Sequence, residues 1–352
     1  MDNHRKSFGV QTELLYAEQL RRYLSTNHLL RTDLLLKKTQ HHIIFPVTSL
    51  PTHLPLTGCT TGSFVFKKKE LIPTSYKKLV GDLPEHLVQK LPTSYDIIGD
   101  ILLIKIPKEL TKYKKEIGRA LLQVHKPIHV VCAMNPVAGE LRTRTVDIIA
   151  GEHRTRTTHT EYGLSFTLDV EKTYFSPRLA TERKRVASLV KQDETIVDMF
   201  AGVAPFSIMI AKYAKPKLVI AVDKNKDAIT YAKQNLKQNK VLDLVEPLYA
   251  DAKNLPKILK KRNINADRII MNLPFSAHQF FEEALQIAAE SCTIHYYDIL
   301  KQEKIKERLE YLRQEAKNHK IIFEEIMVRT IKTYAPREFY IGIDITAHKV
   351  PM

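Results

Sequence analysis

The spacing of apolar side chains changes along the 352-residue chain and divides it into three stretches. The first stretch holds one helical pattern, from Leu14 to Leu24, and a short apolar strand at 41–47. A segment rich in Pro, Thr and Gly follows at 48–63, a composition typical of a loop or linker. The pattern therefore predicts a small N-terminal module at residues 1–65.

Strand patterns dominate the second stretch. Apolar, β-branched runs at 95–107 and 126–134 predict buried strands. The segments 142–152, 155–163 and 164–175 alternate polar and apolar residues instead, which is typical of antiparallel strands with one face in water. We expect an α+β domain at residues 66–185 that carries cationic side chains on its strand faces.

Strands and helices alternate in the third stretch. The strand patterns TIVDMF, LVIAVD and ADRIIMNLP are each followed, after a short link, by a helical pattern. This alternation predicts a doubly wound, mostly parallel sheet in an α/β domain at residues 186–352. Sheets of this kind bind ligands beyond the carboxyl ends of their strands.

Acidic residues end three successive strands of this third stretch. Asp198 ends the first and precedes a turn of small residues with a single glycine, Gly202, so the turn is not a GxGxxG motif. Asp223 follows about 25 residues later, near the spacing at which an acid reaches the hydroxyls of a ribose, and Asp251 ends the next strand. Close packing of strand on helix also explains such a turn. The three acids together favour an adenosine-type ligand held against backbone amides at a helix N-terminus.

The fourth strand ends in Asn272-Leu273-Pro274-Phe275. A proline turn holds the Asn272 amide and the neighbouring carbonyl rigidly, and this pair can hydrogen bond to a planar ring on which Phe275 can stack. An isolated N-x-P sequence is usually only a turn. At a strand end beside the acids, it predicts a clamp for a substrate base.

Four segments, in this order and spacing, resemble the class I S-adenosylmethionine methyltransferases: DMFAGVAPFSIMIAK, AVDKNKDAITYAKQNLKQNKV, DAKNL and MNLPFSAHQF. With TRTTHTEYGLSFTLDVEKTYFSPRLATERKRV upstream, the chain resembles more closely the archaeal and eukaryotic tRNA (guanine(37)-N(1))-methyltransferases, over about residues 70–350. It departs from that family at Ala204, where a second glycine is usual, and at Lys226, where proline is frequent. The resemblance implies a Rossmann-like methyltransferase domain and S-adenosyl-L-methionine as cofactor. It also implies methylation of the guanine 3′ of the anticodon.

The resemblance assigns roles to the residues of the expected site. It implies that Glu182 is the general base and that Asn272 is a catalytic residue that also contacts the cofactor. Further cofactor contacts follow from the resemblance at Arg183, Asp198, Phe200, Ala201, Gly202, Asp223, Lys224, Asp251 and Ala252. No metal site is expected, because the transfer requires no metal and no cluster of metal ligands is visible.

The chemistry of the reaction is consistent with these roles. Guanine N1 carries a proton and is not nucleophilic until the proton leaves, so a carboxylate within hydrogen-bond reach is needed. A cation at O6 stabilises the developing charge. Arg142 stands where the family has that cation, with Arg144 on the same face as an alternative and phosphate contact as a second interpretation of either. Tyr174 and Pro274 are expected to bind the base, which must leave its stack.

The charge of the chain changes the picture in one respect. A net charge of +16 and a pI near 9.5 favour a polyanionic partner. The resemblance implies tRNA, bound at its anticodon stem-loop and, through the N-terminal module, at its outer corner. Lysine runs at 67–69, 77–78, 112–115 and 260–262 fit its backbone. Such runs are also typical of solvated surfaces, and lysine-rich proteins of heat-loving organisms are often basic without binding nucleic acid.

The cysteines and the N-terminal segment indicate the cellular location. The three cysteines, Cys59, Cys132 and Cys292, are far apart and predict neither a zinc site nor a disulfide framework. The N-terminal segment lacks the apolar core of a signal peptide, and no membrane-spanning stretch is present. We expect a cytoplasmic monomer.

Three alternatives share this pattern. One is the wybutosine-pathway enzyme that transfers an aminocarboxypropyl group from the same cofactor, and another is methylation of a wyosine intermediate at the same position. The N-L-P turn and the pair Glu182-Arg183 favour methyl transfer over the aminocarboxypropyl group. The third alternative is a non-catalytic tRNA-binding protein, for which Glu182 would be dispensable.

Overall fold

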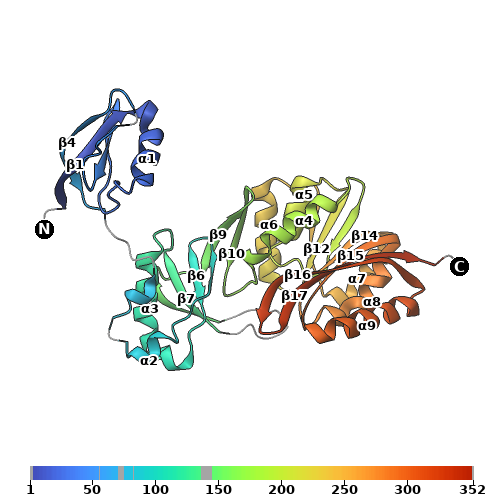
Figure 1. Cartoon of the computed structure of the whole chain (residues 1–352). Helices are drawn as coiled ribbons and strands as arrows, with labels where there is room; N and C mark the ends of the chain where they lie inside the picture. Colours follow the sequence, from blue (N-terminus) through green and yellow to red (C-terminus); the bar gives the residue numbers. More distant parts are fainter. Residues whose placement is uncertain (1–2, 55, 70–74, 82, 136–144, 351–352) are drawn as a thin grey trace. The chain divides into compact units, whose positions relative to one another are not determined.

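The chain forms two compact units, Met1–Ser75 and Tyr76–Met352, in a computed structural model that describes residues 3–54, 56–69, 75–81, 83–135 and 145–350 (Figure 1). The first unit is an antiparallel sheet with one helix, α1 (Ala17–Thr26). Leu20 and Leu24 of α1 pack with Val10 and Phe45 of the sheet in one core. The strand order is β2 (Lys37–Lys38), β3 (His42–Val47), β1 (His4–Glu13) and β4 (Thr60–Lys67).

Two features of this unit differ from the sequence pattern. The segment 48–63, predicted as a loop, ends in strand β4, where Thr60 pairs with Gln11 of β1. Thr60 and Thr61 are exposed, so no apolar alternation marked this strand. The boundary expected near residue 65 falls within β4, and β4 belongs to the first unit because it pairs along β1.

The second unit begins with a four-stranded sheet in the order β5, β6, β7, β8, with α2 (Glu85–Val88) and α3 (Lys114–Val124) beside it. The apolar run at 95–107 is two antiparallel strands that turn at Gly99-Asp100. Gly99 has φ 57°, and a Cβ there would lie 2.2 Å from Oγ1 of Thr157, so only glycine fits. The strands are β5 (Tyr95–Ile98), β6 (Ile101–Ile104), β7 (Val130–Met134) and β8 (Val146–Gly151).

A two-stranded hairpin follows, formed by β9 (Arg156–Glu161) and β10 (Leu164–Asp169), which pair antiparallel as the alternating pattern predicted. The chain then enters helix α4 (Ala180–Leu189) through a short 3-10 turn that starts at Pro177. Proline suits this position because its missing N–H would be unpaired in the first helical turn. Helix α4 carries Glu182 and Arg183, both buried.

A seven-stranded sheet forms the rest of the described second unit, in the order β13, β12, β11, β14, β15, β17, β16. The first five strands of that order are parallel to one another. Strand β17 runs antiparallel to both of its neighbours, β15 and β16, so β16 has the direction of the first five. The strands are β11 (Thr195–Asp198), β12 (Leu218–Asp223), β13 (Val245–Tyr249), β14 (Ala266–Met271), β15 (Ala288–Lys301), β16 (Ile321–Ala335) and β17 (Glu338–Lys349).

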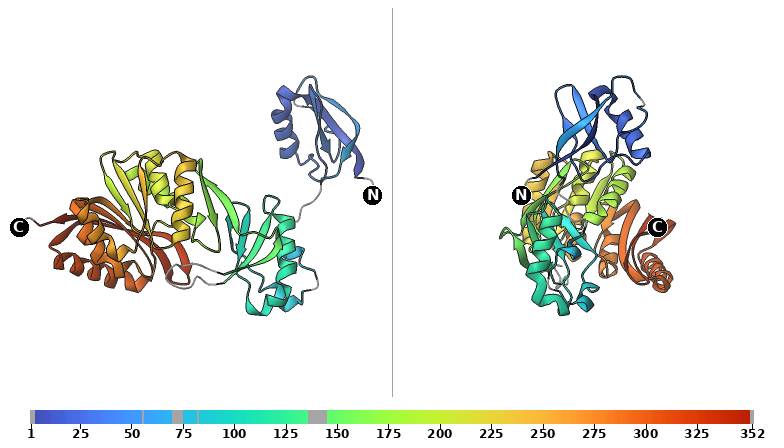
Figure 2. Two further views of the ribbon diagram at one scale, coloured as in Figure 1. Left: turned by 180° about the vertical axis from the view of Figure 1, so that it is seen from behind. Right: turned by 60° about the vertical axis from the view of Figure 1, so that its left-hand side comes forward.

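Helices cover both faces of this sheet (Figures 1 and 2). Helix α4 packs with α5 (Pro205–Tyr213) and α6 (Lys226–Asn239) over one apolar core. Helices α7 (Leu255–Lys261), α8 (Phe281–Ile287) and α9 (Ile305–Asn318) pack over the other. The predicted doubly wound α/β fold is therefore observed. The carboxyl ends of β11, β12 and β14 meet at one edge, which is where Asp198, Asp223 and Asn272 lie.

Candidate active site

Asp198 is buried at the carboxyl edge of the sheet, with 1% of its surface exposed. The Ser207 hydroxyl of α5 donates to its Oδ2 at 2.8 Å, while Oδ1 has no hydrogen-bond partner among the described residues. Burial raises the pKa of Asp198 to about 7, opposed by the Ser207 hydrogen bond and reinforced by the charge of Asp223. A buried carboxylate oxygen without a partner fits a site that a ligand completes.

The turn after β11 places the backbone N–H of Gly202, which has no side chain, next to the carboxylate of Asp223 at the end of β12. Gly202 has φ 57°, and its N–H donates to Oδ2 of Asp223 at 2.7 Å. The N–H of Asn225 donates to Oδ1 of Asp223 at 2.8 Å. Burial raises the pKa of Asp223, and these two N–H groups oppose that rise. Ala204, which replaces the family's second glycine, adopts φ 65°, a conformation that costs a non-glycine residue about 1–2 kcal/mol.

The remaining expected cofactor residues border the same edge. Ala201 is buried and donates its N–H to the carbonyl of Val222 at 2.8 Å. The ring of Phe200 lies 5.1 Å from that of Phe280, edge to face. Asp251 accepts the N–H of Lys253 and so caps the turn that contains buried Ala252, and Lys224 directly follows Asp223 and is partly exposed.

Side-chain hydrogen bonds tie the turn after β14 to the neighbouring strands. The Tyr340 hydroxyl of β17 donates to Oδ1 of Asn272 at 2.5 Å. The N–H of Phe275 donates to Oδ1 of the fully buried Asp298 at 3.1 Å, and Phe275 adopts φ 72°. Pro274 is buried, whereas Phe275 is 48% exposed. The structure thus holds the Asn272 amide in place and presents an aromatic ring beside it.

Glu182 faces the sheet from α4 and is 7% exposed. Arg185 donates to both of its oxygens, at 2.7 and 2.9 Å, and the Tyr297 hydroxyl donates to Oε1 at 2.8 Å. Arg329 lies 3.5 Å from the same oxygen. Burial raises the pKa of Glu182, but the hydrogen bonds from Arg185 and Tyr297 and the arginine charges outweigh burial, so the pKa falls below its ordinary value. Glu182 is therefore ionised at neutral pH.

Arg183 is only 1% exposed and is held by protein groups. Its guanidinium donates to both oxygens of Glu161, at 2.7 and 2.5 Å, and to the carbonyl of Ser176 at 3.2 Å. These contacts fix the segment that begins at Tyr174, whose carbonyl oxygen would lie 3.5 Å from a Cβ at Gly202. Arg183 thus supports the segment beside the turn rather than presenting its guanidinium at the strand edge.

Arg142 and Arg144, the two candidates for the cation at O6, lie outside the described residues. The sequence did not indicate five residues around Glu182, the expected general base: Arg185, Tyr297, Arg329, Tyr340 and Asp344. One signal was available. His295 and Tyr297 stand two positions apart in one strand pattern, a spacing that places two polar groups on one face of a sheet.

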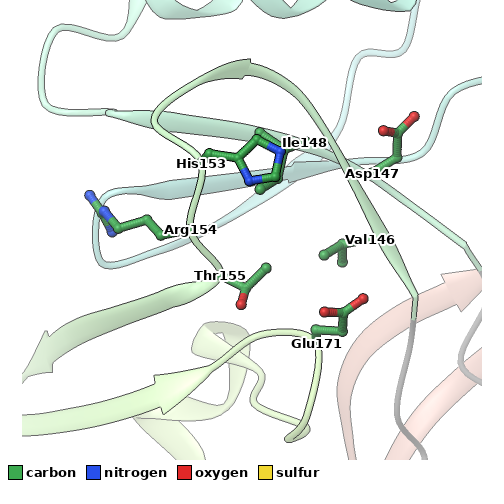
Figure 3. Close-up of a pocket in the computed structure, with 7 residues that line it drawn as sticks. All are labelled: Val146, Asp147, Ile148, His153, Arg154, Thr155 and Glu171. Carbon is green, nitrogen blue, oxygen red and sulfur yellow. The ribbon is translucent and has the colours of Figure 1, made fainter.

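A pocket of about 390 Å³ lies away from this edge, between β8 and the segments that flank the β9–β10 hairpin (Figure 3). Its lining includes Asp147, Arg154 and Glu171, and Arg154 is already paired with Asp100 and Glu152. None of the described residues of the expected site lines it. Within the described ranges, no three His, Cys, Asp or Glu side chains gather to hold a metal ion, and no helix is both long and apolar enough to span a membrane.

Comparison with known proteins places this geometry in a family. The model of the TRM5/TYW2 methyltransferase domain matches residues 157–324, and the TYW2 N-terminal domain matches residues 76–155. Trm5b of Pyrococcus abyssi, a tRNA (guanine(37)-N(1))-methyltransferase, is 40% identical over 96% of this chain and 98% of its own length. The chain belongs to the TRM5/TYW2 methyltransferase family. The resemblance carried by the four segments is confirmed.

Solved structures of TRM5/TYW2 proteins agree in fold. The crystal structure of Trm5b from Pyrococcus abyssi has a TM-score of 0.74 at 39% identity and covers 97% of this chain and 99% of that one. A complex of aTrm5 with tRNALeu has a TM-score of 0.74 at 32% identity, with 96% and 99% covered. The expected enzyme class, an S-adenosylmethionine-dependent methyltransferase of Rossmann-like fold, is confirmed.

The family also includes a different transferase. The tRNA(Phe) (4-demethylwyosine(37)-C(7)) aminocarboxypropyltransferase of Pyrococcus horikoshii is 34% identical to this chain. It covers 76% of this chain and 94% of its own length. The similarity to Trm5b therefore extends over more of this chain than the similarity to the aminocarboxypropyltransferase.

Proposed function

We propose that this protein methylates N1 of guanine 37 in tRNA, with S-adenosyl-L-methionine as the methyl donor. The observation that carries the proposal is the similarity to Trm5b over 96% of the chain. The site geometry supports it. Glu182 is linked through Tyr297 and Tyr340 to Asn272, at the edge where the strand-end acids lie.

The residues at the strand edge bind the cofactor, which supplies an electrophilic methyl group on a sulfonium. Asp223 accepts hydrogen bonds from the ribose hydroxyls, and the bare backbone at Gly202 lets the ligand approach closely. Arg183 contributes indirectly, through its ion pair with Glu161. The other proposed cofactor residues are Asp198, Phe200, Ala201, Lys224, Asp251, Ala252 and Asn272.

Glu182 removes the N1 proton of the guanine. As the proton moves to the carboxylate, the N1 lone pair becomes free to accept the methyl group that the bound cofactor would supply. The lowered pKa of Glu182 keeps its carboxylate ionised at neutral pH. Arg142, or Arg144 in its place, stabilises the charge that develops at O6.

The base reaches this carboxylate only after it leaves the anticodon loop. Tyr174 stacks on the extruded ring and offsets part of the unstacking cost, which is about a few kcal/mol. Pro274 keeps the turn rigid, so Asn272 meets the base without a further loss of conformational freedom. The same proposal places the N-terminal unit on the outer corner of the tRNA, and it includes action in the cytoplasm as a monomer.

Methyl transfer to synthetic tRNA tests the substrate. Unmodified transcripts with guanine, adenine or inosine at position 37 are incubated with methyl-labelled cofactor, and the nucleosides are analysed by mass spectrometry. We expect 1-methylguanosine from the guanine transcript alone. A product with the mass of an aminocarboxypropyl group, or no product, would overturn the proposal. A transcript that carries a wyosine intermediate reveals whether that base is also methylated.

Replacement of Glu182, the proposed general base, tests the mechanism. Glu182→Gln is expected to lower the single-turnover rate by about 10²–10⁴-fold while the Kd for tRNA stays within about twofold, because only proton removal is lost. Glu194→Gln is the matched control. Glu194 is also paired with an arginine, Arg268 at 2.7 Å, and its side chain is only 11% exposed, but it precedes β11 at the opposite edge of the sheet. Full activity of Glu182→Gln would favour a non-catalytic tRNA-binding protein instead.

A further inference from the structure

Tyr297 on β15 is a buried residue with a polar contact to the proposed general base, Glu182. Its side chain is 1% exposed, and its hydroxyl donates to Oε1 of Glu182 at 2.8 Å. The adjacent Tyr296 points to the opposite face of the sheet and donates its hydroxyl to Asp298, also at 2.8 Å. Burial raises the pKa of Tyr297 well above its ordinary value, so its hydroxyl remains a donor at every working pH.

The donors around Glu182 are distributed unequally between its two oxygens. Oε1 accepts from Tyr297 and Arg185 and has Arg329 at 3.5 Å. Oε2, among the described residues, accepts only from Nε of Arg185. An oxygen that already accepts from several donors has little remaining capacity for a proton. The unequal arrangement therefore leaves Oε2 as the oxygen that can receive one.

The two arginines near Glu182 are shared with a second carboxylate, Asp344 of β17. Arg185 and Arg329 lie 2.9 and 2.8 Å from Oδ2 of Asp344. The Nδ1 atom of His295 lies 2.6 Å from Oδ1 of the same residue. Two carboxylates thus share two guanidinium groups. Arg329 contacts Oε1 of Glu182 and Asp344, so among the described arginines near Glu182 only Arg185 donates to Oε2.

Tyr297 also connects Glu182 to the turn at Asn272. The rings of Tyr297 and Tyr340 lie 6.3 Å apart at an angle of 47°, and Tyr340 donates to Asn272. Gly342, opposite Tyr297 on β17, provides the space for this arrangement. A Cβ at Gly342 would lie 3.2 Å from Cε1 of the Tyr297 ring, closer than most Cβ contacts.

We infer that Tyr297 is a positioning residue for the methyl transfer. It fixes the Glu182 carboxylate so that Oε2 receives the N1 proton, and it keeps Glu182 aligned with Asn272. The inference rests on the proposed role of Glu182 as the base. Loss of the Tyr297 hydroxyl would remove one donor to the carboxylate and release its orientation. The protonated form of Glu182 would then be more populated, because one of the groups that favour the charged form is gone.

The experiment compares Tyr297→Phe with Tyr296→Phe, since each variant removes one buried hydroxyl that donates to a carboxylate. Single-turnover rates are measured from about pH 5 to 8 with saturating cofactor and tRNA, and each rate is divided by that of the parent protein at the same pH. The division cancels the titration of guanine itself. We expect Tyr297→Phe to lower the rate about tenfold at neutral pH, as for loss of a hydrogen bond to a charged group. We expect the ratio to fall further in acid.

Tyr296→Phe is expected to give a ratio that does not change with pH, because its hydroxyl faces the other side of the sheet. Gly342→Ala is a second variant in which Tyr297 is displaced but intact, and we expect the same acid-dependent fall at smaller size. A constant ratio for both Tyr297→Phe and Gly342→Ala would overturn the role of Tyr297. If Glu182→Gln were fully active in the same assay, the base assignment itself would fail, which is a distinguishable result.

Discussion

Asp198 is the residue at which burial and charge conflict most directly. Its pKa is raised to about 7, chiefly by burial, against an ordinary value of 3.8. The folded protein thus binds this proton more tightly than the unfolded chain. The stabilising contribution is fully present below about pH 4 and is lost as the pH rises to about 7.

This linkage gives a prediction for the cofactor-free protein. Asn at position 198 does not titrate, so the free energy of unfolding of the parent protein should fall relative to that of Asp198→Asn between about pH 4 and 7. The expected change is on the order of a few kcal/mol. Urea unfolding at a series of pH values measures it. Parallel pH curves for the two proteins would show that Asp198 does not titrate in this range.

Arg183 and Glu182 are adjacent in the sequence but contact different strands. The sequence places both on the helix that enters the catalytic domain, and the helix turns one toward Glu161 and the other toward Tyr297. The sequence pattern identified the pair, but it could not assign the two partners, because these lie on β9 and β15, far away along the chain. Removal of one partner of a buried ion pair costs about 3–5 kcal/mol, so Arg183 is as much a structural residue as a site residue.

At the scale of elements, helix α6 completes the edge of strand β10. Asn235 accepts the N–H of Thr167 at 2.8 Å and donates to its carbonyl at 3.1 Å. One turn later, Asn239 makes the same pair of contacts with Ser165, at 3.0 and 2.7 Å. The two side-chain amides thus replace the backbone groups of a neighbouring strand. They fix the β9–β10 hairpin to the methyltransferase domain.

Asn235→Ala should therefore lower the free energy of unfolding by about 2 kcal/mol. The substitution leaves a buried backbone N–H and carbonyl of Thr167 without partners, and each unsatisfied group costs about 1–3 kcal/mol, partly offset by the better helix propensity of alanine. Gln234→Ala, an exposed neighbour on the same helix, should change it by less than about 0.5 kcal/mol. Equal effects of both substitutions in urea unfolding would contradict this role for Asn235.

The elements also show where pattern reasoning ends. The alternation of strands and helices predicted the parallel sheet correctly, because each buried strand is short and apolar and each link is short. It did not reveal that β17 runs antiparallel to its neighbours, since a turn at Arg337, with φ 62°, joins β16 to β17 in place of a crossover helix. Strand-end acids such as Asp223 could be found from position alone. Tyr297 and Asp344 could not, because their importance depends on which strands become neighbours.

At the scale of the whole molecule, the net charge of +16 could stabilise the fold, bind a polyanionic partner or be solvated. Some cations are already neutralised within the protein. Lys114 pairs with Asp147, and Arg262 pairs with Glu246. Both pairs are partly exposed, and exposed ion pairs contribute only about 0–1 kcal/mol to stability. The remaining lysines therefore serve either a polyanionic partner or solvation, and stability of the fold does not decide between the two.

Salt dependence separates these two purposes. Each phosphate that a cation neutralises releases counterions, so binding through several phosphates weakens steeply as salt concentration rises. We expect the Kd for tRNA to rise by about tenfold or more between 50 and 200 mM salt, values within the range over which such contacts are lost. The Kd for S-adenosylmethionine, measured on the same protein by calorimetry, should change by less than about twofold, because few charges are involved. If tRNA binding were as insensitive to salt as cofactor binding, the excess of lysine would be a solvated surface, and recognition of tRNA would depend on shape and base contacts instead.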